Sequence, residues 1–124
     1  ALGREDPFRV YGPEQRRAFC HVADALEAII RLMATEGAWG QIVNIGNDAE
    51  ETTVAELVGL VLRTARFQPT IEPLPAPPGS VARRCPDLGR LRALTGFVPK
   101  VPLEDGVAET FAWYRAWREG QARP

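Results

Sequence analysis

Two adjacent arginines, Arg83 and Arg84, are the residues of this sequence best suited to bind an anion. They lie just before Pro86, and the backbone that leads into a proline is biased away from the helix, so we predict an extended segment. Successive side chains of an extended segment point to opposite sides, so one arginine can face a site while the other stays in solvent. Each planar guanidinium can grip carboxylate or phosphate oxygens through two hydrogen bonds.

A second non-helical segment carries Arg17, six residues past Tyr11. Arg17 and Arg84 together could hold a doubly charged diphosphate, and each charge-assisted bond would contribute on the order of 1.5–3 kcal/mol once partly desolvated. Two simpler interpretations stay open. The arginines could be solvated surface residues, and Arg17 could form a structural pair with Asp24 or Glu14.

The composition is that of one ordinary globular domain. The chain has 124 residues and a formal net charge of -1, so we expect a single domain over residues 1–124 and no general affinity for nucleic acid. No stretch approaches the ~20 apolar residues of a membrane span. The isolated cysteines Cys20 and Cys85 are typical of a reducing compartment, which predicts a cytoplasmic location. The chain lacks an initiator methionine, so we expect a piece of a longer protein.

Hydrophobic periodicity predicts a helix-rich α+β fold with a few short strands. The predicted elements are strands at residues 8–11, 41–46 and 70–72, and helices at 23–36, 54–65, 88–94 and 103–119. A proline-rich loop at 73–82 is expected to deliver the two arginines, and residues 1–7 and 119–124 are expected to be flexible.

Local signals mark the ends and faces of these helices. Thr53 and Glu56 form a capping box, whereas Gly37 and Gly96 are expected to end the helices that precede them. One side of the helix at 23–36 is apolar, and it is formed by Val22, Leu26, Ile29, Ile30 and Met33. The last helix carries two tryptophans, Trp113 and Trp117. We expect them to pack in the core; the alternative is that they contact another domain or subunit.

Several signatures of catalysis are absent from the sequence. There is no glycine-rich phosphate turn and no evident nucleophile with a base, and neither Tyr11 nor Tyr114 has a lysine four positions on. The single histidine, His21, excludes a multi-histidine metal site. We therefore expect this chain to bind no metal and no cofactor by itself.

Three phrases, in order, resemble one family. They are VYGPEQRRAFCHVADALEAI, IVNIGNDAEETTVAEL and RRCPDLGRLRALTGFVPKVPLEDGVAETFAWY. From about residue 8 to residue 118 the chain resembles the C-terminal portion of extended short-chain dehydrogenases/reductases, in the NAD-dependent nucleotide-sugar epimerase/dehydratase family. The Gln-x-Arg-x-Phe, Asn-Ile-Gly-Asn and Arg-x-Pro phrases are most similar to those of UDP-glucuronate decarboxylases. Phe97 departs from the tryptophan that the family usually has there.

The resemblance implies roles for four residues. Gln15 and Arg17 match residues that hold the nucleotide diphosphate, and Tyr11 matches a residue beside the nucleotide. Arg84 matches an arginine that faces the substrate and, in decarboxylases, supports catalysis near the sugar carboxylate. The family's Rossmann half, which carries the NAD site and a Tyr-x-x-x-Lys pair, is absent from this sequence.

Two functions follow as hypotheses. In the first, the chain is the substrate-binding part of an enzyme that oxidises a nucleotide sugar with NAD and then epimerises, dehydrates or decarboxylates it, and the part alone is inactive. A UDP-sugar and the missing Rossmann domain are then its expected partners. In the second, it is a non-catalytic interaction module that kept the fold and lost the chemistry. Self-association is expected under either hypothesis, because separation from a Rossmann half exposes apolar surface.

Overall fold

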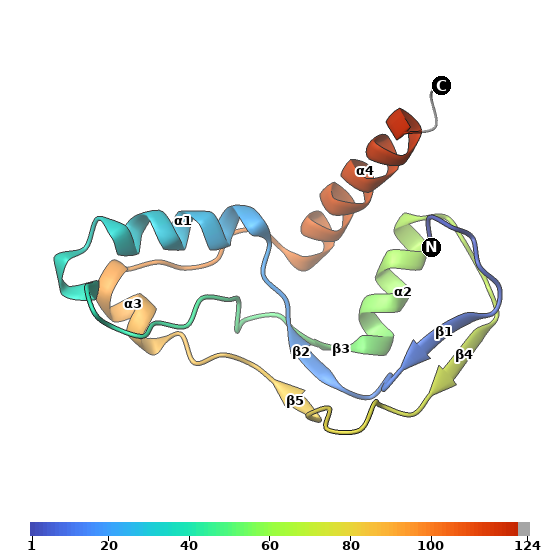
Figure 1. Ribbon diagram of the computed structural model, residues 1–124, viewed down its shortest axis with the longest axis horizontal. Coiled ribbons are helices and arrows are strands. Elements are labelled where there is room, and N and C mark those ends of the chain that lie inside the picture. The colour runs from blue at the N-terminus through green and yellow to red at the C-terminus, as the bar shows by residue number, and fades with distance from the viewer. Residues whose placement is uncertain (122–124) are drawn as a thin grey trace. The chain divides into compact units, whose positions relative to one another are not determined.

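The computed structural model describes residues 1–121 (Figure 1). These residues form two compact units. The first unit comprises Ala1–Gln15, Thr53–Ala82 and the chain from Glu104 onward, and the second comprises Arg16–Thr52 and Arg83–Leu103. Helices with a few short strands make up both units, which confirms the predicted helix-rich α+β class. Residues 122–124, part of the predicted flexible end, lie outside the described residues.

The first unit is built on a two-stranded parallel sheet. β1 (Phe8–Tyr11) pairs with β4 (Ile71–Leu74), which confirms the strands predicted at 8–11 and 70–72. β4 runs two residues into the predicted proline-rich loop. It includes Pro73, because a strand with a free edge tolerates a residue that cannot donate a hydrogen bond. Helix α2 (Val54–Thr64) packs against β1, and its Leu60 and Leu62 are buried.

The capping box at the start of α2 is confirmed. The backbone amide of Glu56 donates to Thr53 Oγ1 at 3.1 Å, and the amide of Thr53 donates to Glu56 Oε2 at 2.7 Å. Two of the amides that a helix start leaves without a backbone acceptor are thereby satisfied.

Helix α4 (Leu103–Gln121) follows the predicted range closely, but its two tryptophans do not pack in a core. Trp113 is 61% exposed and Trp117 is 52% exposed, so the expected core packing is wrong for this chain. Trp113 meets Tyr114 edge to face, with ring centroids 4.8 Å apart. Within residues 1–121, no helix combines the length and apolarity that crossing a bilayer demands.

The second unit holds a three-stranded sheet and a helical core. β2 (Arg16–Ala18) lies between β3 (Glu51–Thr53) and β5 (Arg83–Arg84). Helix α1 (Val22–Met33) packs on α3 (Gly89–Thr95), and a 3-10 turn, η1 (Glu36–Ala38), follows α1. Four buried residues form the core: Ala28, Leu88, Leu91 and Phe97. Leu32, Val43 and Ile45 pack against it half-buried.

A buried carboxylate fixes the loop after α3 to the start of α1. Asp24 is 2% exposed, and its side chain accepts hydrogen bonds from the backbone amides of Lys100, at 3.1 Å, and Val101, at 3.0 Å. The Lys100 ammonium pairs with Glu27 one turn further along α1, with Nζ and Oε1 3.1 Å apart. Asp24 also lies in the first turn of α1, where negative charge is favourable.

Two local predictions in the second unit are wrong. Gly37 does not cap α1, because the helix ends at Met33 with Ala34 as its right-handed C-cap, and the Thr35 hydroxyl already donates to the Arg31 carbonyl. The buried strand predicted at 41–46 does not form, and Ile42 is 87% exposed. A strand needs a neighbour to satisfy its backbone groups, and nothing within residues 1–121 pairs with this segment. Gly96, by contrast, caps α3 in the left-handed conformation, as expected.

Candidate functional site

The two predicted arginine segments are neighbouring strands of the second unit. β2 and β5 run parallel, with Arg16 opposite Arg83 and Arg17 opposite Arg84. Side chains that face each other across a register share one side of a sheet, and the side alternates along a strand. Arg17 and Arg84 therefore lie together on one face, and Arg16 and Arg83 lie together on the other.

On the face that carries Arg16 and Arg83, both arginines form ion pairs with one carboxylate. Glu51 Oε1 and Oε2 accept from Arg83 Nε at 2.8 Å and Nη2 at 3.0 Å, and Arg16 Nε lies 3.6 Å from Oε1. The hydrogen bond from Arg83 and the positive charges of both arginines hold the pKa of Glu51 below its ordinary value. The ionised Glu51 carboxylate therefore stabilises the fold at pH values above the ordinary pKa of glutamate. This stabilisation is lost as the pH falls through the lowered pKa of the folded state.

The Arg17 and Arg84 face is arranged differently. Arg84 is exposed, and its side chain makes no hydrogen bond or ion pair with any of residues 1–121. Arg17 is half-buried, and its Nη1 donates to the Arg16 carbonyl at 2.7 Å. Like charges directly opposite on neighbouring strands repel, which makes this face a favourable place for an anion.

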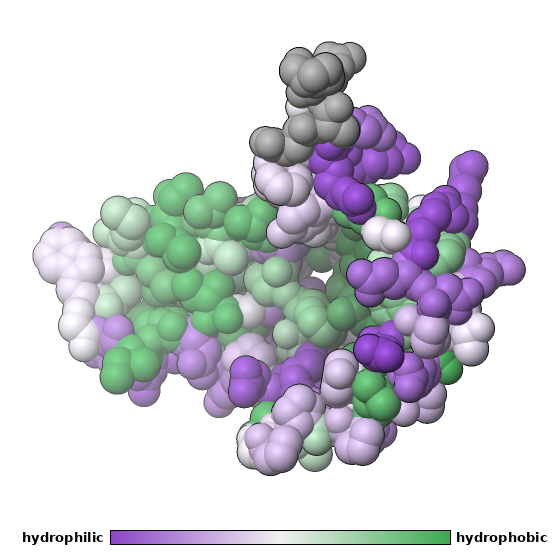
Figure 2. All heavy atoms as spheres, turned by 45° about the vertical axis from the view of Figure 1, so that its right-hand side comes forward, coloured by the Kyte–Doolittle hydropathy of each residue, from purple (hydrophilic) through white to green (hydrophobic). Residues whose placement is uncertain are grey.

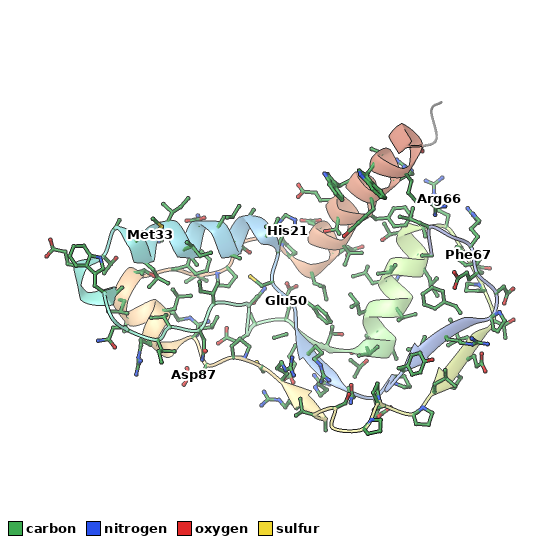
Figure 3. The ribbon with its side chains drawn as sticks, viewed as in Figure 1. His21, Met33, Glu50, Arg66, Phe67 and Asp87 are labelled. Atoms are coloured by element: carbon green, nitrogen blue, oxygen red, sulfur yellow. The ribbon has the colours of Figure 1, made fainter. Side chains whose placement is uncertain are left out.

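The buried core that follows β5 positions this strand. Asp87, labelled in Figure 3, accepts a hydrogen bond from the Gly89 amide at 2.7 Å and so starts the turn into α3. Leu88, between them, is 1% exposed in the core. Immediately before β3, the strand at the other edge of the sheet, Glu50 accepts from the Leu103 amide at 2.8 Å. β5 is therefore only a few residues along the chain from Leu88 in the buried core, and this anchors the strand pair.

Tyr11 and Gln15 belong to the first unit. Tyr11 ends β1 and is 55% exposed, whereas Gln15 is 7% exposed. Gly12 has a φ of 56°, and a Cβ added there would lie 2.9 Å from the Gln15 side chain, so the turn needs a glycine. Two hollows of about 550 Å³ in this unit lie elsewhere, around Arg66 and Phe67, which are labelled in Figure 3. Neither is lined by Tyr11 or Gln15.

Glu51 is the residue of this region that the sequence did not reveal. It lies 32 residues from Arg83 in the chain and sits in a run of acidic and polar residues that reads as a solvated loop. No spacing rule connects the two. Among residues 1–121, no three histidine, cysteine, aspartate or glutamate side chains gather as metal ligands would.

Comparison with known proteins shows which enzymes the chain resembles. No family model matches it. It is 34% identical over 114 residues to UDP-glucuronic acid decarboxylase 1 of Danio rerio, a match that covers 91% of this chain and 27% of that protein. Other curated relatives include a dTDP-glucose 4,6-dehydratase and a dTDP-4-dehydro-6-deoxy-D-allose reductase. The chain spans about a quarter to a third of the length of such relatives.

Solved structures agree with the sequence comparison. The UDP-glucose 4-epimerase of Thermotoga maritima, solved with UDP-glucose, is 26% identical with a TM-score of 0.80, over 94% of this chain and 37% of that one. MoeE5, solved with UDP-glucuronic acid and NAD, is 27% identical with a TM-score of 0.77, over 89% and 37%. Over about nine tenths of its length the chain thus matches the C-terminal portion of extended short-chain dehydrogenases/reductases that include nucleotide-sugar epimerases, dehydratases and decarboxylases.

Proposed function

We propose that this chain is the nucleotide-sugar-binding part of an NAD-dependent epimerase, dehydratase or decarboxylase, and that Arg17 and Arg84 hold the diphosphate of its substrate. The observation that carries the proposal is the register between β2 and β5, in which Arg17 is opposite Arg84 on one face of the sheet. Relatives of the chain act on UDP- and dTDP-linked sugars, and all such substrates share a diphosphate.

The charge arrangement supports an anion on this face. Glu51 is engaged by Arg16 and Arg83 and so offsets the positive charge of the opposite face. A diphosphate would offset the charge of Arg17 and Arg84 in the same way, and the guanidinium geometry allows two-bond contacts. Arg84 is the better donor of the two, because within residues 1–121 no group occupies its side chain.

Arg84 also bears on the identity of the sugar. A second role for Arg84, near a sugar carboxylate, would suit a UDP-glucuronate decarboxylase, and the Danio rerio relative bears that name. Tyr11 and Gln15 are proposed as nucleotide contacts from the family resemblance alone. The parent protein would bind NAD through its other part, and NAD would supply the reversible oxidation of the sugar.

We expect Arg84→Ala to weaken UDP binding by roughly 10- to 100-fold, because a charge-assisted contact is worth about 1.5–3 kcal/mol. Arg17→Ala should act in the same direction. Isothermal titration of the 124-residue chain with UDP measures both. Arg118→Ala is the matched control, since it removes an exposed arginine of α4, and it should leave binding unchanged. Wild-type affinity in both Arg17→Ala and Arg84→Ala would remove these arginines from the site.

The chain alone should not turn over a nucleotide sugar. It carries neither a glycine-rich NAD turn nor a tyrosine with a lysine four positions on. Incubation with NAD and UDP-glucuronic acid, followed by absorbance of NADH and chromatography of the sugar nucleotide, checks this. Sustained conversion that tracks the purified polypeptide would contradict the proposal.

A further inference from the structure

One of the two hollows in the first unit is lined by three arginines. Arg4 lies near the start of the chain, Arg66 follows the end of α2, and Arg115 lies on α4, so three separate segments of one unit bring them together. The hollow measures about 550 Å³, and within residues 1–121 no carboxylate lines it. In Figure 2 hydrophilic residues project from the side of this unit that holds, in Figure 1, the chain start and the end of α2. Figure 3 labels Arg66.

No acidic side chain offsets the charge of these three arginines. Within residues 1–121 none of their side chains makes an ion pair or a hydrogen bond. Other arginines of the chain are paired: Arg9 Nε lies 3.0 Å from Glu72 Oε2. In the same way, Arg83 Nε lies 2.8 Å from Glu51 Oε1. The net charge of the chain is -1, so three uncompensated guanidinium groups around one hollow are a local excess of positive charge.

The end of α2 gives Arg66 a backbone conformation that usually belongs to glycine. The Phe67 amide donates to the Leu62 carbonyl at 3.1 Å. The Arg66 amide donates to the Arg63 carbonyl at 3.0 Å. These two bonds define a Schellman motif, in which the residue after the helix cap is left-handed and most often glycine. Arg66 takes that position with a φ of 48°, which is unfavourable for a residue that has a Cβ.

Arg4 shares this unusual backbone. Its φ is 50°, and within residues 1–121 Arg4 and Arg66 are the only non-glycine residues with a positive φ. The Phe67 ring holds the Arg4 side chain, because the guanidinium carbon lies 5.3 Å from the ring centroid. Backbone strain persists where the surrounding structure enforces it, and it is concentrated at functional sites such as ligand clamps. Two strained arginines at one hollow therefore point to a use for their side chains.

We propose that Arg4, Arg66 and Arg115 form a second anion site, which binds a multiply charged phosphate compound. A phosphate group presents three oxygens around one centre, which suits donors on three segments, whereas a carboxylate presents two oxygens in one plane. The Thr64 hydroxyl donates to the Leu60 carbonyl at 3.0 Å, so within residues 1–121 the guanidinium groups are the side-chain donors that the hollow offers. The site uses no residue of the proposed diphosphate site in the second unit, so the two proposals fail separately.

A nuclear magnetic resonance titration with inorganic pyrophosphate tests this site. It is made on the 124-residue chain and on its Arg17→Ala, Arg84→Ala double variant, in which the proposed diphosphate site cannot contribute. The salt concentration is about 0.15 M, where charges more than about 8 Å apart are largely screened. We expect saturable shifts of the Arg4, Arg66 and Phe67 amide signals in both proteins. Citrate, which carries a similar charge on carboxylates, should bind about fivefold more weakly or less.

Arg66→Gly separates ligand binding from stability. Glycine suits the left-handed position, so this variant should unfold at a higher urea concentration, while its affinity for pyrophosphate falls about fivefold. Arg115→Ala should weaken binding by a similar factor, because alanine keeps the helix and removes only the charged group. Arg63→Ala is the matched control. It removes an exposed arginine of the same helix end that does not line this hollow, and the affinity should change less than about twofold.

The proposal is wrong if pyrophosphate produces no saturable shift at Arg66 and Phe67, or if citrate binds as tightly. It is also wrong if Arg66→Gly and Arg115→Ala bind pyrophosphate as the unchanged chain does. A loss in Arg63→Ala as large as theirs would reduce the effect to general attraction by a positive surface. An Arg66→Gly chain that unfolds at a lower urea concentration would show that the arginine supports the helix end, which removes the backbone argument for a ligand.

Discussion

Phe97→Ala should lower the free energy of unfolding of the second unit by about 3–5 kcal/mol. Phe97 is 1% exposed and packs in the cluster of Ala28, Leu88 and Leu91. Truncation of its side chain therefore leaves a cavity in a core of only four buried residues. The Arg31 guanidinium, 5.7 Å from the ring centroid, would lose a cation–π contact as well. No other single truncation in this unit removes as much buried volume.

Hydrogen exchange of the α1 and α3 amides across a urea series measures this loss for the second unit alone. Val98→Ala is the matched control, because the neighbouring side chain is 57% exposed and its truncation should cost less than about 0.5 kcal/mol. Since Leu88 follows β5 by only a few residues, the truncated protein should also bind UDP more weakly. A Phe97→Ala protein as stable as the Val98→Ala protein would show that the four-residue core does not support the unit.

Asp24→Ala should destabilise the second unit by about 1–3 kcal/mol for each backbone amide that loses its acceptor. The two amides are those of Lys100 and Val101, which together hold the loop after α3 against α1. Loss of the carboxylate also removes a favourable charge from the first turn of the helix.

Asp24→Asn separates these effects. The amide oxygen can still accept a hydrogen bond, but the negative charge is gone, so this variant should lose less than half of what Asp24→Ala loses. Urea denaturation with the exchange of the Lys100 and Val101 amides as local probes gives both numbers. Equal losses in the two variants would mean that charge, rather than hydrogen-bond acceptance, is what this site requires.

The local elements followed from neighbours in the sequence. The alternation at 8–11 gave β1, Thr53 and Glu56 set the start of α2, and Gly96 set the end of α3. Each signal depends on residues within one turn or one strand, so it needs no knowledge of distant contacts. The family likewise followed from three phrases in order, and the comparisons bear it out.

Contacts between segments distant in the sequence could not be predicted from the sequence. Residues 41–46 carry the composition of a buried strand, but a strand also needs a partner, and none lies within residues 1–121. The apolar stripe predicted on α1 is present, yet the helix buries the opposite side, because the Asp24 carboxylate accepts hydrogen bonds from the loop at Lys100. In both cases part of the apolar surface that the pattern describes, Ile42 and the α1 stripe, stays exposed within residues 1–121.

The sequence by itself indicated which residues are chemically suited to an anion, because the charge and the planar shape of a guanidinium belong to the residue. It also predicted that these arginines lie in extended or non-helical segments, although it did not predict β2 or β5 as strands. Only the tertiary structure decided that Arg17 stands opposite Arg84 while Glu51 serves the other face. That arrangement depends on a register between segments 67 residues apart in number, and a register is fixed by the packing of the whole unit rather than by either segment alone.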